Sequence, residues 1–316
     1  MLPSRYNTRN LRRLVDNPRL ALGELNRFGR ELNRNYYRHS GPPSGTDVMA
    51  EDWDTLVLLD GCRYDLYRDR TTFANDVKRR TSVGSDSWEF LDGTFGGRQC
   101  HDTVYVTANP HAYRLPDGVF HYHRNLLDEA WDPEVGTVRP PDMAAAVREA
   151  NERFPDKRLL VHFMQPHFPF LGETGRRLTG PGIDMHLDDE ERSGELDVWD
   201  KLRYGELDRA VVWEAYRENL DIVLGTVRSL DADLDGKTVV STDHGNLVGD
   251  RLRPVPVRGY GHPRGLYVPE LVEVPWQVIS SGDRRTIRAD PPAETDDDGP
   301  SDAVVADRLR NLGYKA

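Results

Sequence analysis

Two apolar segments of the sequence each end in a carboxylate, and a histidine follows the second. Thr55 to Leu59 precede Asp60, and Thr238 to Thr242 precede Asp243 and His244. Short aliphatic and β-branched runs of this kind are typical of buried parallel strands, whose ligands bind beyond their carboxyl ends. We therefore expect the three polar side chains to share one crevice. Because two carboxylates in one crevice repel each other, and because an imidazole adjoins them, the pattern favours a divalent metal. The alternative for Asp60 is to cap a following helix.

A hydroxyl-rich loop lies between these two acids in the sequence. It runs from Thr81 to Phe90 and carries Ser82, Ser85 and Ser87 around Gly84. An isolated serine cluster most often forms a turn and a helix cap. A serine placed next to a metal can instead lose its proton and become a nucleophile. The acids on either side of the loop in the sequence make this second role worth testing.

Two histidines lie in loops that contain proline. His167 has a proline directly before it and another two residues after it, and His262 is followed by Pro263. Proline stiffens such loops and would hold each imidazole in one place. Together the two histidines indicate a functional site. His162 alternates with the apolar residues of its segment, and we interpret it as structural.

Composition narrows the classes of function. The 316 residues have a formal net charge of -11, which argues against nucleic-acid binding by the protein as a whole. Five lysines among 42 basic residues, together with the excess of acids, predict a halophilic source, although a GC-rich genome would also favour arginine. Cys62 and Cys100 are too few for a disulfide framework. With neither a segment of roughly 18 apolar residues nor a signal-peptide core, the sequence predicts a cytoplasmic protein.

The chain is expected to form one catalytic domain with appendages. Residues 1–46 form an Arg-rich extension in which leucines recur at near-helical spacing, which predicts one or two amphipathic helices. Such a helix either packs on the main domain with a solvated basic face or makes peripheral contact with a membrane or a partner. Residues 47–316 form the catalytic domain. Within it we expect a cap or insertion at 172–207, an acidic loop at 281–300 and a final helix at 301–312.

Strands and helices alternate through the main domain. This order predicts an α/β fold in which helices cover both faces of a sheet. The expected strands are 53–59, 104–108, 158–164, 238–242 and 274–279, and the expected helices are 63–78, 141–153 and 208–230.

Five motifs resemble the alkaline phosphatase superfamily, in its sulfatase and phosphodiesterase-like branch. They are LLDGCRYD, the Gly-Ser loop, HFMQPHFPF, STDHGN and YGHPRGLYVPELVEVPW, and they occur in the order found in that family. The resemblance spans about residues 50–316. It implies a three-layer α/β/α sandwich with a mostly parallel central sheet and a nucleophile next to a divalent metal.

The resemblance assigns roles to particular residues. Similarity to the threonine loop of lipoteichoic acid synthases and to the Cys-x-Pro-Ser-Arg loop of sulfatases selects Ser85 as nucleophile and metal ligand, with Ser87 as the alternative two residues on. His167 and His262 match positions that bind a second metal or the transferred group. The implied metal ligands are Asp60, Ser85, Asp243 and His244, and the implied substrate-binding residues are Arg63, Ser87 and Arg264.

Two departures from the family pattern shape the functional prediction. The Cys-x-Pro-x-Arg signature is absent, which argues against formylglycine chemistry, and Gln165 stands where bimetallic members place a carboxylate, which favours one metal site over two. We therefore predict a hydrolase or transferase of phosphate mono- or diesters that uses Mn, Zn, Mg or Ca and a covalent seryl intermediate. Its substrate would be a small-molecule or lipid-linked ester. The alternatives are a sulfate ester hydrolase, a phosphomutase or nucleotide pyrophosphatase, and a non-catalytic scaffold that uses the basic N-terminal helix. The oligomeric state is not indicated.

Overall fold

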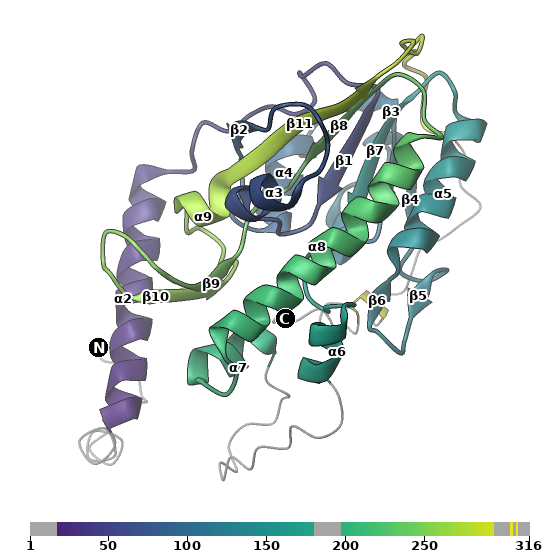
Figure 1. The fold of residues 1–316 in the computed structure, drawn as a ribbon. Helices are drawn as coiled ribbons and strands as arrows, with labels where there is room; N and C mark the ends of the chain where they lie inside the picture. Colours follow the sequence, from purple (N-terminus) through teal and green to yellow (C-terminus); the bar gives the residue numbers. More distant parts are fainter. Residues whose placement is uncertain (1–17, 180–196, 294–303, 306–307, 309–316) are drawn as a thin grey trace.

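A computed structural model describes residues 18–179, 197–293, 304–305 and 308 of the chain (Figure 1). Its centre is a seven-stranded sheet in the order β2-β11-β8-β1-β7-β3-β4. β8, β1, β7, β3 and β4 pair in parallel, whereas β11 is antiparallel to both of its neighbours. The strands of this sheet are β1 (Thr55–Leu59), β2 (Lys78–Thr81), β3 (Cys100–Thr107), β4 (Phe120–Asn125), β7 (Arg158–Phe163), β8 (Lys237–Ser241) and β11 (Glu273–Ser281).

Helices cover both faces of the sheet. Val57 and Leu59 of β1 join the core cluster that packs under α5 and α8, whereas Leu56 and Leu58 join the opposite cluster, under α4. All five residues of β1 are buried, as expected of a parallel strand enclosed on both faces. The predicted three-layer α/β/α architecture with a mostly parallel sheet is confirmed. The helices around it are α3 (Tyr64–Arg70), α4 (Ser87–Phe95), η1 (Pro110–Arg114), α5 (Pro140–Arg153), α6 (Glu173–Thr179), α7 (Val198–Tyr204), α8 (Arg209–Asp231) and α9 (Pro269–Val272).

The helix predicted over 63–78 is wrong in length. α3 ends at Arg70, because Thr71 adopts a non-helical conformation, and the chain then reaches β2, which pairs with β11 at the sheet edge. The hydroxyl-rich segment also differs from the expected loop, since it turns into α4 at Ser87. Asp86 caps α4 by accepting a hydrogen bond from the Glu89 N–H at 2.7 Å. The turn and helix cap that the sequence analysis gave as the alternative for this segment are thus present, and the Asp-x-x-Glu spacing is the signal for them.

Outside the central sheet lie two small hairpins and the N-terminal helix. The hairpins are β5 (Trp131–Asp132) with β6 (Thr137–Val138), and β9 (Leu247–Arg251) with β10 (Arg258–Gly261). α2 (Pro18–Ser40) runs along one edge of the molecule beside β9 and β10 (Figure 1). Among the helices described, none is both long enough and apolar enough to cross a membrane.

Parts of the predicted appendages are described. α6 and α7 lie in or at the border of the predicted insertion at 172–207, whose residues 180–196 fall outside the described part of the chain. Of the final helix predicted at 301–312, only residues 304, 305 and 308 are described, so that prediction stands as it was made.

Candidate functional site

The two predicted carboxylates meet at the carboxyl edge of the sheet. Asp60 follows β1, and Asp243 lies two residues beyond β8, its parallel neighbour. Both side chains are fully buried. The turn after β1 ties them together, since the Gly61 N–H donates to Asp243 Oδ1 at 2.9 Å. Gly61 has a φ of +60°, a conformation that a residue with a Cβ adopts only with strain, which accounts for glycine at this turn.

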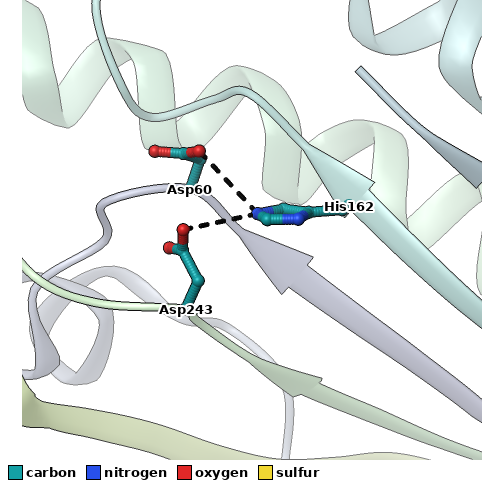
Figure 2. Close-up of side chains that lie close together, drawn as sticks. All are labelled: Asp60, His162 and Asp243. Atoms are coloured by element: carbon teal, nitrogen blue, oxygen red, sulfur yellow. Dashed lines mark ion pairs between the residues drawn. The ribbon is translucent and has the colours of Figure 1, made fainter. Parts of the chain in front are cut away.

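His162 joins this pair, contrary to our interpretation of it as a structural residue. Figure 2 shows its imidazole facing both acids, with Nε2 3.6 Å from Asp243 Oδ2 and 3.8 Å from Asp60 Oδ2. It lies near the end of β7, on the same face as Leu160, which packs on the α4 side of the sheet. The strand alternation was therefore read correctly, but at the strand end this face opens onto the site. On the other side of the ring, Nδ1 lies 3.0 Å from the Tyr105 hydroxyl.

The serine at the carboxylates is Ser87. Its Oγ lies 3.1 Å from Asp60 Oδ2 and 3.1 Å from His244 Nε2, and the side chain is buried. Ser87 is the first residue of α4, where the helix dipole favours negative charge. Asn109, which sequence reasoning missed, donates from Nδ2 to Asp60 Oδ2. Its place directly beyond β3 was the available signal.

Ser85, the predicted nucleophile, is not at the carboxylates. Its Oγ donates to Glu89 Oε2 at 2.7 Å and accepts a hydrogen bond from the Gly265 N–H at 2.9 Å. These bonds fasten the loop before α4 to the segment after His262. Of the two serines that the prediction named, the structure brings Ser87 to the carboxylates, because α4 begins at Ser87 and directs that hydroxyl, rather than the one two residues earlier, into the crevice.

The donor atoms fit a divalent cation. Bonds of about 2.0–2.1 Å in a tetrahedral site place neighbouring ligand atoms about 3.3 Å apart. His244 Nε2 lies 3.4 Å from Asp243 Oδ2, 3.9 Å from Asp60 Oδ1 and 3.1 Å from Ser87 Oγ. Asp60 Oδ1 and Asp243 Oδ2 are buried and have no hydrogen-bond partner in the described structure, an arrangement that is costly unless a cation satisfies them.

A second group of three potential ligands contains the same two carboxylates. Asp60, His162 and Asp243 offer ligand atoms that all lie within 4.8 Å of one another. His162 Nε2 is buried without a hydrogen-bond partner in the described structure. His162 is therefore either a further ligand of the same cation or a donor that orients the carboxylates, depending on which ring nitrogen carries the proton.

The pKa shifts of the two acids also favour a cation in the crevice. Burial, followed by repulsion from Asp243, raises the pKa of Asp60 well above its ordinary value. Burial also acts to raise the pKa of Asp243, but His244, His162 and the Gly61 N–H outweigh it and lower that pKa. The raised pKa of Asp60 favours a proton on that carboxyl where no cation is bound, and a cation would compete with this proton.

His167 and His262 lie together beside this centre. Their Nε2 atoms are 2.9 Å apart, and the ring of His262 also lies tilted against that of His244, with 4.7 Å between centroids. Burial lowers the pKa of His167 to about 4, and burial followed by the proximity of His244 and His167 lowers that of His262 well below its ordinary value. Both imidazoles are therefore neutral near pH 7. The structure brings this predicted pair to the site.

The two predicted substrate-binding arginines differ in position. Arg63 is buried and pairs with Asp65 at 2.7 Å and Asp250 at 2.9 Å, so in this structure it links the turn after β1 to β9. Arg264 remains partly exposed, and its Nε donates to Asp86 Oδ2 at 2.7 Å, next to Ser87. The other basic group near the site is His111, on η1, whose pKa burial and then Arg114 lower to about 3.

Comparison with known proteins gives structural matches alone. No family model matches the chain, and neither does any curated protein. Among solved structures, the integral membrane lipooligosaccharide phosphoethanolamine transferase A from Neisseria meningitidis matches with a TM-score of 0.42 and 12% identity, over 78% of this chain and 53% of that one. The chain thus spans about half the length of that protein.

Two further matches come from other bacteria. An alkaline phosphatase superfamily protein from Vibrio parahaemolyticus matches with a TM-score of 0.39 and 13% identity, over 81% of this chain and 70% of that one. The lipoteichoic acid synthase LtaP from Listeria monocytogenes matches with a TM-score of 0.35 and 11% identity, over 90% of this chain and 78% of that one. The Vibrio protein is described as a member of the superfamily that the sequence motifs resemble. At such TM-scores these matches carry no argument about activity, which must rest on the site itself.

Proposed function

We propose that the protein is a metal-dependent enzyme that transfers or hydrolyses phosphate esters, with Ser87 as its nucleophile. The observation that supports this most directly is the position of Ser87 Oγ, 3.1 Å from both an Asp60 oxygen and His244 Nε2 at the N-terminus of α4. Helix capping does not account for the position of this buried hydroxyl between a carboxylate and an imidazole, because the Asp86 side chain already caps α4.

In this proposal Asp60, Asp243 and His244 hold a divalent cation, with His162 as a ligand or as a positioning residue. When bound, the cation supplies a lowered pKa for the serine hydroxyl and neutralises charge on the phosphate. Ser87 Oγ then forms a bond to phosphorus while the bond from phosphorus to the ester oxygen breaks. The N–H groups at the start of α4 stabilise the negative charge on the transferred group.

His167 and His262 lie where they can take part in proton transfer. Their low pKa values keep both imidazoles neutral, and His167 Nδ1 already donates to the Phe168 carbonyl oxygen at 2.6 Å. In the proposal an imidazole nitrogen of this pair accepts the proton that Ser87 loses, and the departing ester oxygen takes a proton from water. Attack by water on the phosphoseryl group gives a hydrolase, whereas attack by an alcohol gives a transferase.

The test compares two serines, Ser85 and Ser87, that lie two positions apart in the sequence. Wild type, Ser87→Ala and Ser85→Ala are assayed with para-nitrophenyl phosphate, bis-para-nitrophenyl phosphate and para-nitrophenyl sulfate, each with Mn, Zn, Mg or Ca. We expect turnover of a phosphate ester that needs added metal, a fall of at least about 10³-fold in Ser87→Ala, and a smaller fall in Ser85→Ala.

Other outcomes separate the alternatives. Turnover of the sulfate ester alone would favour a sulfatase. Loss in Ser85→Ala with activity retained in Ser87→Ala would return the nucleophile to the residue that the sequence motifs selected. Neither turnover nor bound metal, measured by elemental analysis, would overturn the proposal and favour a scaffold.

A further inference from the structure

Between residues 25 and 36, the N-terminal helix α2 presents its large apolar side chains outward. Leu25, Phe28, Leu32 and Tyr36 follow one another at intervals of three and four residues and form a single stripe. Their exposed fractions are 62%, 59%, 42% and 53%. Over the described part of the chain, this outer stripe holds four of the seven large apolar side chains that are exposed.

Apart from Tyr37, which packs against Tyr267, the side of α2 that faces the body consists of polar or small residues. Asn33 is buried and exchanges two hydrogen bonds with the backbone of Val255, its Nδ2 donating at 2.9 Å and its Oδ1 accepting at 2.8 Å. Gly29 lies against Val257 so closely that an added Cβ would clash with it. Asn26 Oδ1 accepts from the Arg258 N–H at 3.4 Å. The helix is therefore anchored through its polar face, the reverse of the packing expected for a helix on a soluble domain.

The charge of this segment is opposite to that of the rest of the chain. Residues 1–40 contain nine arginines against three acids, a net charge of +6, whereas residues 41–316 contain 33 Lys and Arg against 50 Asp and Glu, a net charge of -17. Among the arginines of α2 are Arg27, Arg30, Arg34 and Arg38. Two such basic helices would repel each other, which disfavours a second copy of the chain as the partner. An anionic surface would attract them.

We propose that the outer stripe of α2 docks on an anionic lipid membrane. The apolar side chains would enter the boundary between headgroups and acyl chains, and the long arginine side chains would reach the headgroup phosphates. The acidic body would be held off the surface by its own charge, so α2 would be the contact. This inference stands independently of the proposed enzymatic activity.

Docking through α2 would also place the candidate site near the surface. Arg34 Nε donates to the Arg264 carbonyl oxygen at 3.3 Å, and the rings of Tyr37 and Tyr267 meet edge to face at 6.2 Å. Arg264 in turn contacts Asp86 beside Ser87, and the Tyr267 hydroxyl donates to Glu89 of α4. The membrane-facing helix and the loops of the crevice are thus directly connected.

The experiment measures vesicle binding by the full chain. Wild type is sedimented with vesicles of phosphatidylcholine alone and of phosphatidylcholine with an equal part of phosphatidylglycerol, at low and high salt. The stripe variant carries Phe28→Ser and Leu32→Ser. A matched control carries Val211→Ser and Ile222→Ser, which alter two exposed apolar residues of α8. Melting temperatures show whether both variants remain folded.

We expect wild type to bind anionic vesicles at least about tenfold more tightly than neutral ones and to weaken with salt. The stripe variant should bind anionic vesicles at least about tenfold less tightly than wild type, and the control should bind them as wild type does. Absence of vesicle binding, equal binding to both lipids, or an unchanged stripe variant would overturn the proposal. A wild-type dimer in light scattering that the stripe variant dissociates, without vesicle binding, would overturn it in favour of a second copy. Para-nitrophenyl ester turnover, measured in parallel without vesicles, reports on the active site separately.

Discussion

The crevice at the carboxyl edge of the sheet and the outer stripe of α2 depart from ordinary burial in opposite directions. The crevice encloses Asp60 and Asp243 where water cannot reach them, and two of their oxygens have no hydrogen-bond partner in the described structure. The stripe leaves Phe28 and its neighbours in water. Each departure costs free energy in the isolated chain, and each would be relieved by the binding partner proposed for it: a cation in the crevice and an anionic lipid surface at the stripe.

The two regions also differ in how they are held. The crevice sits between β1, β7 and β8, whose side chains belong to the two large core clusters, so its groups are fixed by the whole fold. α2 is attached through the hydrogen bonds of Asn33, the packing of Gly29 on Val257 and the edge-to-face contact of Tyr37 with Tyr267. We therefore expect the crevice to be preorganised for chemistry and α2 to lose its attachment without unfolding of the domain.

The largest expected effect is in the crevice. Asp243→Asn keeps an oxygen to accept the Gly61 N–H but removes the charge that a cation needs. We expect turnover to fall by at least about 10³-fold and the rise in melting temperature on adding metal to vanish. Asp221→Asn, at an exposed ion pair with Arg70, is the control and should change neither. A metal-dependent rise in melting temperature that survives in Asp243→Asn would mean that the cation binds elsewhere.

The next largest effect is expected on the pH dependence of stability, through His123 on β4. Burial lowers the pKa of His123 to about 4, and its ring stacks on Tyr105 at 5.1 Å. In the unfolded chain His123 takes up a proton near its ordinary pKa, whereas the fold resists protonation until about pH 4. Its contribution, on the order of 3 kcal/mol, is therefore present above about pH 6.5 and is lost as pH falls towards 4.

His123→Phe keeps a ring against Tyr105 but cannot take up a proton. We expect its free energy of unfolding to depend less on pH than that of wild type between about pH 6.5 and 4. Urea titrations at several pH values measure this. Superimposable pH profiles for the two proteins would contradict the assignment of His123.

A smaller effect is expected from the residue that orients His162. Tyr105→Phe removes the hydroxyl that lies 3.0 Å from His162 Nδ1. If the ring sits at the cation, metal affinity should fall by about 10-fold, in line with loss of a partner that orients a ligand. Tyr122→Phe, on the neighbouring strand β4, is the control. Calorimetric titration of Mn or Zn measures both, and an unchanged affinity in Tyr105→Phe would leave His162 without a role at the cation.

The smallest expected effect sharpens the comparison from the side of α2. Asn33→Ala removes both hydrogen bonds to Val255, and a pair of this kind contributes about 1–3 kcal/mol. We expect faster hydrogen exchange of the α2 amides, with exchange in β1 and β8 unchanged. Asn35→Ala alters an exposed position and should leave exchange as in wild type. Faster exchange throughout the sheet would show instead that α2 is part of the cooperative core.

The sequence predicted most of what depends on local pattern. The central strands β1, β7 and β8 and the helices α5 and α8 lie close to the predicted ranges, because parallel strands buried on both faces and long amphipathic helices have strong periodic signals. β4 was missed because its sequence, FHYHRN, is polar for a strand. α4 was missed because its start rests on a capping signal, Asp86 with Glu89, rather than on periodicity.

The amino-acid sequence by itself determined that Asp60, Asp243 and His244 would meet, since residues at the ends of adjacent parallel strands share one sheet edge. It also determined the opposite charges of residues 1–40 and the remainder. The tertiary structure alone decided the rest: that Ser87 rather than Ser85 faces the acids, that His162 joins them, and that α2 turns its apolar side outward. These choices depend on where a helix begins and on which surface a neighbouring element covers, and neither is encoded in the spacing of residues along one segment.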